Sequence, residues 1–161
     1  MRDDELKIVA LALIGVMGVV AVYPTLASRR IVEPFSELGV LGPLGKLGDY
    51  PSQVAVGERF NLFLFVSNYE GKAEYYRVEA KLGDKSSVVN ETTRLSVDPF
   101  AAWDFVLMNG ENSTLPITLS LGEQGLDRRL VFELHRFDTD TEAFVYHQRW
   151  VQLWMNVTRT S

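Results

Sequence analysis

Residues 8–27 form an uninterrupted run without a charged side chain, and this run constrains the chain more than any other feature. As an α-helix with a rise of about 1.5 Å per residue it would be about 30 Å long, which matches the hydrocarbon core of a bilayer. Its apolar residues would lie on all sides of such a helix, so no polar face remains to rest on a membrane surface. The run predicts one membrane-spanning helix, with the membrane lipid bilayer as its partner.

Two other interpretations of this run remain open. A cleaved signal peptide has an apolar region of about 7–15 residues that ends at small residues. Thr25-Leu26-Ala27 would serve as a cleavage site, but the run is long enough to span a bilayer. A buried helix of a soluble domain is disfavoured by the length of the uncharged run. We therefore expect an uncleaved anchor that follows a short tail at residues 1–7.

Three N-glycosylation acceptor patterns predict the orientation of the chain, namely the Asn-x-Thr triplets that begin at Asn90, Asn112 and Asn156. Asn156 is the weakest candidate because it lies in a predicted strand. Two basic residues precede the apolar run and two follow it, so charge does not decide the orientation. We expect a single-pass protein of the cell membrane whose C-terminal domain lies outside and carries glycan.

The part of the chain after the apolar run, about 130 residues, is long enough for one hydrophobic core. The chain has no cysteine, which excludes a disulfide framework and a thiolate metal site. Its net charge is −5 and it contains no basic run, so we expect no nucleic acid partner. We expect a membrane-proximal linker and first strand over residues 28–52, followed by an ectodomain over residues 53–161.

Apolar and polar residues alternate through most of this ectodomain, as they do in half-buried strands. Turn dipeptides such as Asn109-Gly110 separate the alternating segments. The pattern predicts an all-β fold, an antiparallel immunoglobulin-like β-sandwich of about seven strands. The segments with strand character are 35–41, 60–67, 75–82, 86–89, 95–97, 103–108, 115–121, 130–137 and 143–157.

A series of short motifs lies between Glu33 and Gly71. The motifs are Glu33 to Phe35, Leu41 to Pro43, Gly45-Lys46, Tyr50-Pro51, Val56 to Glu58 and Asn68. This series resembles the ectodomain of an archaeal membrane-protein family, domain of unknown function 1616, and the resemblance extends more weakly to the region of Trp154. It implies an archaeal, membrane-tethered sandwich without an established activity or site. Similar proteins often have several membrane helices before this domain, whereas this chain has one apolar run.

The sequence contains no serine-nucleophile motif, no glycine-rich phosphate loop and no HExxH pattern. If the last hairpin is centred near Thr141, His135 lies opposite His147, and Asp138 or Asp140 would complete a nitrogen–oxygen metal site. A shift of one residue removes this arrangement, so ordinary surface histidines are the preferred interpretation. The two aspartates also lack the glycine and glutamate of a calcium loop. We therefore expect no enzyme, no cofactor and no metal.

Three segments carry the predicted partner contacts. The apolar run contains two glycines on which another helix could pack, although they are three residues apart instead of the four of the common motif. The membrane-proximal segment is either a structured loop or a contact surface. In the closing strand, aromatic residues share a face with two glutamines, and this face either points outward or packs beneath a loop. The predicted contacts are Gly15, Gly18, Leu38, Leu41, Leu44, Tyr146, Trp150 and Trp154.

Two functions from different classes follow from these features. The first is a non-catalytic, membrane-anchored extracellular β-sandwich, an accessory or structural subunit that binds other proteins of a membrane or cell-envelope assembly. The second is a surface module that binds glycans or lipid headgroups. The sequence does not define the oligomeric state.

Overall fold

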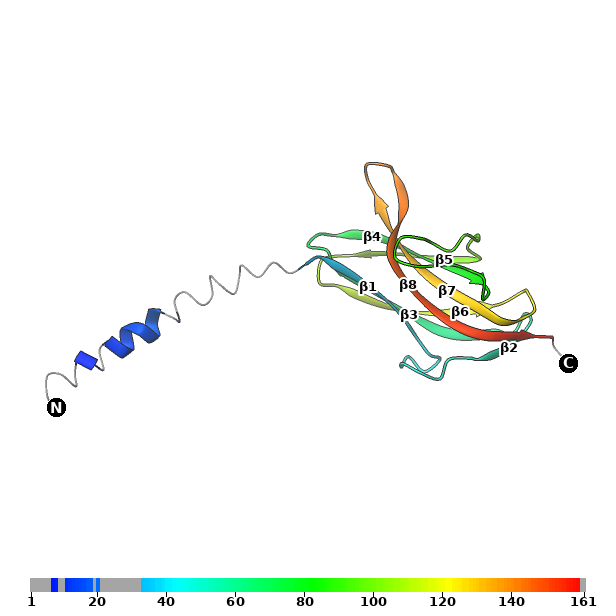
Figure 1. Ribbon diagram of the computed structural model, residues 1–161, viewed down its shortest axis with the longest axis horizontal. Coiled ribbons are helices and arrows are strands. Elements are labelled where there is room, and N and C mark those ends of the chain that lie inside the picture. Colours follow the sequence, from blue (N-terminus) through cyan, green and yellow to red (C-terminus); the bar gives the residue numbers. More distant parts are fainter. Residues whose placement is uncertain (1–6, 9–10, 19, 21–32, 160–161) are drawn as a thin grey trace. The chain divides into compact units, whose positions relative to one another are not determined.

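The computed structural model describes residues 7–8, 11–18, 20 and 33–159, which belong to two compact units, Met1–Glu33 and Pro34–Ser161 (Figure 1). Of the span predicted over residues 8–27, residues 9–10, 19 and 21–27 lie outside the described residues. Among the described residues no helix is long and apolar enough to cross a membrane. The prediction of a spanning helix over residues 8–27 is corrected accordingly.

The second unit is an all-β sandwich of two sheets (Figure 1). The smaller sheet has the order β1-β3-β6, with β1 (Phe35–Leu41), β3 (Arg59–Tyr69) and β6 (Asn112–Ser120). The larger sheet has the order β2-β8-β7-β4-β5, with β2 (Gln53–Ala55), β4 (Glu74–Gly83), β5 (Ala101–Leu107), β7 (Gly125–Asp138) and β8 (Ala143–Thr158). All neighbours pair antiparallel except β2 and β8, which are parallel. The predicted all-β sandwich is confirmed, with eight strands in the described residues instead of about seven.

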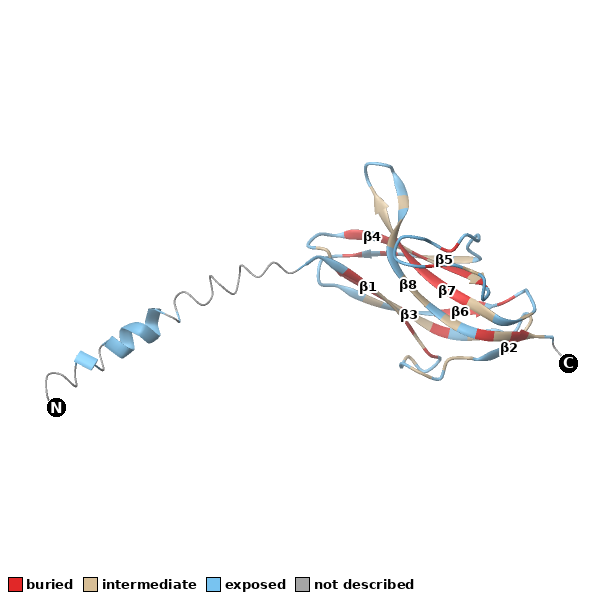
Figure 2. Ribbon diagram, viewed as in Figure 1, coloured by how far each residue is buried: buried red, intermediate tan, exposed pale blue. Residues whose placement is uncertain are grey.

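The hydrophobic core lies between the two sheets and follows the predicted period of two. Figure 2 shows the buried residues distributed along the strands of both sheets. Because alternate side chains of a strand point to the same face, β3, β4 and β7 each contribute three fully buried apolar side chains to this core. These are Leu62, Leu64 and Val66 of β3, Tyr76, Val78 and Ala80 of β4, and Leu130, Phe132 and Leu134 of β7.

Residues 84–100, the covering segment, connect β4 to β5 without forming a strand. The strands predicted over 86–89 and 95–97 are therefore wrong. Two apolar residues of the segment, Val89 and Leu95, are buried in a second small core on the outer face of the larger sheet, together with Val131 of β7 and the partly buried Trp150 of β8. These apolar residues hold a long connection against the sheet.

An irregularity in β8 determines which way its side chains point. His135 pairs with Tyr146 and Leu134 pairs with Arg149, so His147 and Gln148 form a bulge. Gln148 has a φ of 57°, a left-handed conformation that non-glycine residues seldom adopt outside such features. His135 therefore faces Glu79 on the outer side of the larger sheet, whereas His147 contacts Ser36 of the other sheet. The predicted opposition of the two histidines is wrong.

Candidate functional site

Four ionisable side chains lie together on the outer face of the larger sheet, beneath the covering segment. Glu79 and Lys81 come from β4, and Glu133 and His135 come from β7. Glu79 pairs directly with Glu133, and the two-residue period of both strands places the other two on the same face. Lys81, Glu133 and His135 are each no more than 2% exposed, and Glu79 is half-buried. We call these four residues the ion cluster.

Short contacts connect the members of the ion cluster. Lys81 Nζ donates to Glu133 Oε2 at 2.8 Å and lies 3.1 Å from Glu79 Oε2. The other oxygen of Glu133 accepts a hydrogen bond from the Leu95 amide at 2.5 Å. His135 Nε2 lies 3.3 Å from Glu79 Oε2 and 3.5 Å from Glu133 Oε2, without a hydrogen bond. The cluster thus fastens the covering segment to the sheet through Leu95.

The ionisation of Glu133 argues against a role as a catalytic base. Burial on its own raises the pKa of the Glu133 carboxyl. His135, the Lys81 ammonium and the Leu95 amide act in the opposite direction and outweigh burial, so this pKa lies below its ordinary value of 4.5. A general base works best with a pKa near the operating pH. Glu133 is instead an ionised partner of Lys81.

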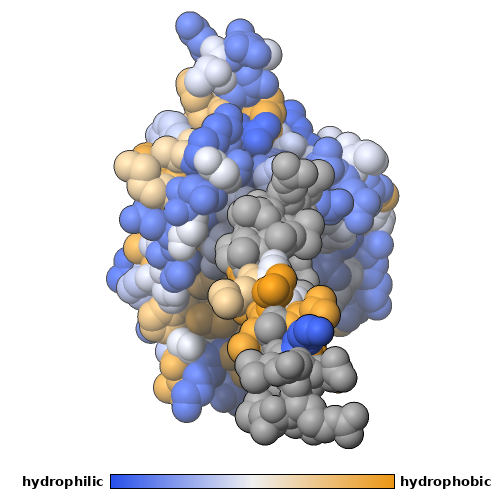
Figure 3. Space-filling model, turned by 90° about the vertical axis from the view of Figure 1, so that its left-hand side faces the viewer, coloured by the Kyte–Doolittle hydropathy of each residue, from blue (hydrophilic) through white to orange (hydrophobic). Residues whose placement is uncertain are grey.

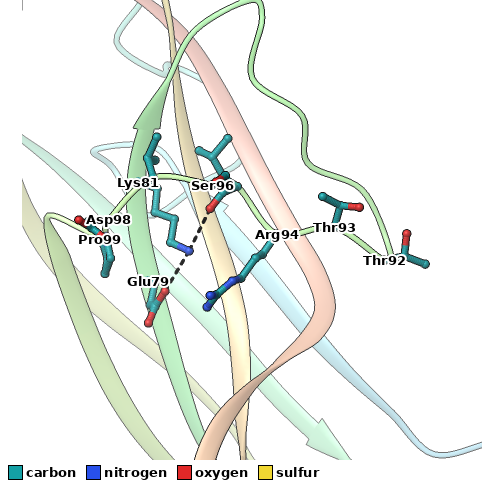
Figure 4. Close-up of a pocket in the computed structure, with 10 residues that line it drawn as sticks. Glu79, Lys81, Thr92, Thr93, Arg94, Ser96, Asp98 and Pro99 are labelled. Atoms are coloured by element: carbon teal, nitrogen blue, oxygen red, sulfur yellow. Dashed lines mark hydrogen bonds and ion pairs between the residues drawn. The ribbon is translucent and has the colours of Figure 1, made fainter.

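A polar pocket of about 620 Å³ opens between the ion cluster and the covering segment (Figure 4). Glu79 and Lys81 line one side of it, and residues 92–99 line the other. In Figure 4 the Arg94 side chain extends from the covering segment toward Glu79 and Lys81. This volume falls within the range of small-ligand sites. The pocket offers hydroxyl groups and charges of both signs.

A second polar cluster links the two sheets at Ser36 of β1. The Ser36 hydroxyl donates to Glu70 Oε1 at 2.6 Å and lies 2.7 Å from the Tyr76 hydroxyl and 3.0 Å from His147 Nε2. Glu70 Oε1 lies 3.0 Å from the same imidazole nitrogen. In a serine–histidine–carboxylate triad the carboxylate binds the opposite ring nitrogen, which orients the base. Ser36 is also only 2% exposed, so this cluster connects the sheets and offers no accessible nucleophile.

Burial lowers the pKa of His147 below its ordinary value of 6.5, and the opposing effect of Glu70 does not compensate. The imidazole of His147 is therefore neutral at pH 7. A neutral imidazole carries one N–H group, which can donate a hydrogen bond to Ser36 or to Glu70. His147 therefore has a structural role in this cluster.

An aromatic and arginine surface lies at the base of the β7–β8 hairpin, which projects beyond the rest of the sandwich (Figure 1). We call it the hairpin patch and define it as Tyr75, Arg77, Val106, Phe137 and Phe144. The ring of Phe144 lies 4.9 Å from that of Tyr75 and 5.4 Å from that of Phe137. The Arg77 guanidinium lies 4.1 Å above the Phe144 ring, a cation–π contact. In Figure 3 hydrophobic surface lies just below the hydrophilic tip of the hairpin.

Asp104 of β5 holds two members of the hairpin patch in place. Its carboxylate accepts two hydrogen bonds from Arg77, at 2.7 and 2.9 Å, and one from the Tyr75 hydroxyl at 2.8 Å. Tyr75 remains 36% exposed and Val106 69% exposed. The patch is therefore ordered and still open to solvent.

The predicted contact residues of the first half of the chain lie in two separate units. Gly15 and Gly18 belong to the helical run 11–18, where an added Cβ would meet no atom within 4 Å. Leu38 packs against the core, Leu41 is half-buried and Leu44 is 75% exposed. Of the three leucines, only Leu44 presents most of its side chain to solvent.

The aromatic face of the closing strand points away from the core, but the covering segment lies over part of it. The Tyr146 hydroxyl donates to the Asn90 carbonyl at 2.9 Å, and Trp150 packs against the small core of the covering segment. Trp154 is 44% exposed, with the Arg129 guanidinium 5.5 Å from its ring. Trp154 is thus the most exposed of the three predicted aromatic contacts.

Sequence reasoning missed both the ion cluster and the hairpin patch. The four residues of the ion cluster occupy alternate positions of β4 and β7, but nothing local shows that residues 84–100 cover them. The hairpin patch joins residues from four strands. Its only local signal was the density of aromatic residues on either side of the hairpin turn.

Solved structures give two comparisons of low identity. A β-glucosidase from Listeria innocua matches with a TM-score of 0.51 and 16% identity, over 78% of this chain and 16% of that chain. The CARDB domain of the PF1109 protein from Pyrococcus furiosus matches with a TM-score of 0.49 and 15% identity, over 80% of this chain and 96% of that chain. The likeness to the β-glucosidase shows a shared β-sandwich fold alone. Comparison with curated proteins gave no match.

The comparison with protein families confirms the resemblance that the motifs between Glu33 and Gly71 predict. The matching family is described as a domain of unknown function (DUF1616), and the match covers residues 30–156. Because these residues are most of the 161-residue chain, the chain belongs to this family of domains of unknown function.

Proposed function

We propose that the β-sandwich is a non-catalytic module that binds another protein, as an accessory or structural subunit of a larger assembly. The hairpin patch is the observation that carries this proposal. Aromatic residues and arginine are enriched at the centres of protein interfaces and contribute most of the binding energy there. Since Asp104 already holds Arg77 and Tyr75, binding would cost little side-chain entropy.

A glycan-binding or lipid-headgroup-binding surface is the alternative function. The closing strand would have to present several aromatic rings to such a ligand. Tyr146 and Trp150 are instead engaged with the covering segment, and Trp154 is left as a single exposed ring. This arrangement favours the protein partner.

A photo-crosslinking amino acid at Val106 is expected to give a discrete covalent adduct with one protein. The full chain would be produced in its organism of origin, irradiated and analysed by mass spectrometry. Val106 is 69% exposed beside the aromatic rings, so a partner seated on the patch would lie within reach. Phe144→Ser should lower the yield about tenfold, as loss of a central aromatic contact does.

Leu126, 72% exposed at the other end of β7, is the matched control position. It should give no adduct with the same protein. An equal yield from Leu126, or the absence of any adduct from Val106, would show that the hairpin patch is not the binding surface.

We also propose that the domain acts outside the cytoplasm, and the acceptor asparagines support this location to different degrees. Asn90 is exposed; its Oδ1 accepts hydrogen bonds from the Thr92 amide at 2.9 Å and the Thr92 hydroxyl at 3.0 Å, and its Nδ2 donates to none of the described residues. Asn112 is exposed at the start of β6. Asn156 is half-buried in β8, and its Oδ1 accepts from the Asp127 amide at 2.9 Å.

Glycan is therefore expected on Asn90 and Asn112 and not on Asn156, because transfer requires an accessible carboxamide nitrogen. Intact-mass measurement of the chain from its native source should show two glycans. Thr92→Ala and Thr114→Ala should each remove one, and Thr158→Ala should change nothing beyond the substitution itself. An unmodified chain would remove the support for a location outside the cytoplasm.

A further inference from the structure

We propose that Glu79, Glu133 and His135 form a binding site for a divalent transition-metal cation, in competition with the Lys81 ammonium. One ligand atom from each of the three residues lies within 4.8 Å of the other two. One imidazole and two carboxylates are ligands that Zn²⁺ accepts, with water in the fourth position. The site is independent of the hairpin patch.

Two of the three ligand separations in the ion cluster match a tetrahedral coordination sphere. Metal–ligand bonds of about 2.1 Å at tetrahedral angles place neighbouring ligand atoms about 3.4 Å apart. His135 Nε2 lies 3.3 Å from Glu79 Oε2 and 3.5 Å from Glu133 Oε2. These separations suit a shared cation better than a direct hydrogen bond, which is shorter.

His135 supplies a second, independent indication. Its side chain is 1% exposed, and its Nε2 atom is buried without a hydrogen-bond partner while it points at the two carboxylates. Nearly all buried polar atoms in proteins have such a partner. A cation between the three side chains would give the nitrogen a bond and would account for its orientation.

The charges of the ion cluster also favour a divalent cation. The Lys81 ammonium lies 2.8 Å from Glu133 Oε2 and 3.1 Å from Glu79 Oε2, which is the place that a cation shared by both carboxylates would take. A divalent cation in place of the ammonium balances both carboxylates. Lys81 lines the polar pocket, so its ammonium has a solvated space into which it can withdraw. The Leu95 amide would continue to orient Glu133.

The test is a calorimetric titration of ZnCl₂ into the full chain after dialysis against a chelator. We expect one Zn²⁺ per chain in the wild type and an affinity about tenfold or more lower in Glu79→Gln. Glu79 is suited to this test because it is the most exposed of the three ligands, and far-UV circular dichroism would verify that the variant folds. His147→Gln is the matched control, since the other histidine lies in the Ser36 cluster, and it should leave the affinity unchanged.

Two further measurements separate this site from adventitious binding. Co²⁺ should give the intense visible bands of a tetrahedral site in the wild type and lose them in Glu79→Gln. Lys81→Met should bind Zn²⁺ more tightly, because it removes the competing ammonium; if this variant does not fold, the Glu79 and His147 variants still decide. A wild type that binds no Zn²⁺, or an affinity that Glu79→Gln leaves unchanged, would overturn the proposal and identify Lys81 as a permanent counter-ion.

Discussion

Replacing Glu133 by Gln is expected to lower the free energy of unfolding by about 3–5 kcal/mol, the usual cost of removing one partner of a buried ion pair. Glu133 is fully buried, and its carboxylate binds both the Lys81 ammonium and the Leu95 amide. The variant would leave the ammonium with a single, half-buried carboxylate, Glu79. Urea denaturation of the full chain, followed by far-UV circular dichroism, measures the loss as a shift of the midpoint.

The double variant Lys81→Met with Glu133→Leu is the control for this expectation. Removing both charges leaves only the half-buried Glu79 carboxylate without its ammonium partner, so the double variant should recover more than half of the stability that Glu133→Gln loses. If it proves as unstable as the sum of the two single variants, the cost comes from lost packing and not from an uncompensated charge.

The stability of the wild type should depend on pH because of the same Lys81–Glu133 pair. The pKa of Glu133 is lower in the folded chain than its ordinary value of 4.5, which applies to the unfolded chain. The stabilisation by the ionised carboxylate is therefore complete above pH 4.5 and is lost as the pH falls through the lower, folded-state pKa. Below pH 4.5 the wild type should lose stability more steeply than Glu133→Gln. Glu70, whose pKa is also lowered despite the raising effect of burial, adds the same slope to both proteins.

The strands of the core were predictable because burial there alternates with a period of two. The strand predicted over 75–82 is the central part of β4, and Tyr76, Val78 and Ala80 are its fully buried face, as the alternation indicates. β2 was missed because three residues, Gln53–Ala55, are too short to show a period. Its pairing with β8 is parallel and joins distant parts of the chain.

The ion cluster was not predictable because burial on the outer face of a sheet depends on what covers it. Glu79 and Lys81 have the spacing of a solvated face, and within β4 itself that interpretation is sound. The covering segment changes their environment, since Leu95 brings its amide to Glu133 and its carbonyl to within 3.4 Å of Lys81 Nζ. Val131, an apolar residue of the same parity on β7, was a hint that this face is covered.

The register of the last hairpin was wrong for a local reason. The hairpin pairs Asp138 with Ala143, whereas a centre at Thr141 would pair Asp138 with Phe144. The bulge at His147 and Gln148 then shifts the pairing again. Gln148 has the left-handed conformation, and the sequence does not indicate this, because the position holds neither glycine nor asparagine.

Asn68, one of the residues that carry the resemblance to the family, connects the β3–β4 turn to the end of β5. It is fully buried, and its Nδ2 donates to the carbonyls of Lys72 and Leu107, both at 2.8 Å. Its Oδ1 accepts from the Glu70 amide at 2.9 Å. The side chain thus uses its whole amide group to satisfy backbone atoms of the β3–β4 turn and of the end of β5.

Asn68→Ala is therefore expected to destabilise the domain by about 3–5 kcal/mol, because it leaves three backbone groups without their partner at about 1–3 kcal/mol each, partly relieved by water. Thermal and urea unfolding of the full chain measure this loss. Asn109→Ala is the matched control at the same end: its Oδ1 accepts one hydrogen bond, from the Gly71 amide at 2.8 Å, and it is exposed, so about 1 kcal/mol or less is expected. Equal losses of free energy of unfolding in the two variants would contradict this expectation. They would mean that burial does not strengthen the contribution of the Asn68 hydrogen bonds to stability.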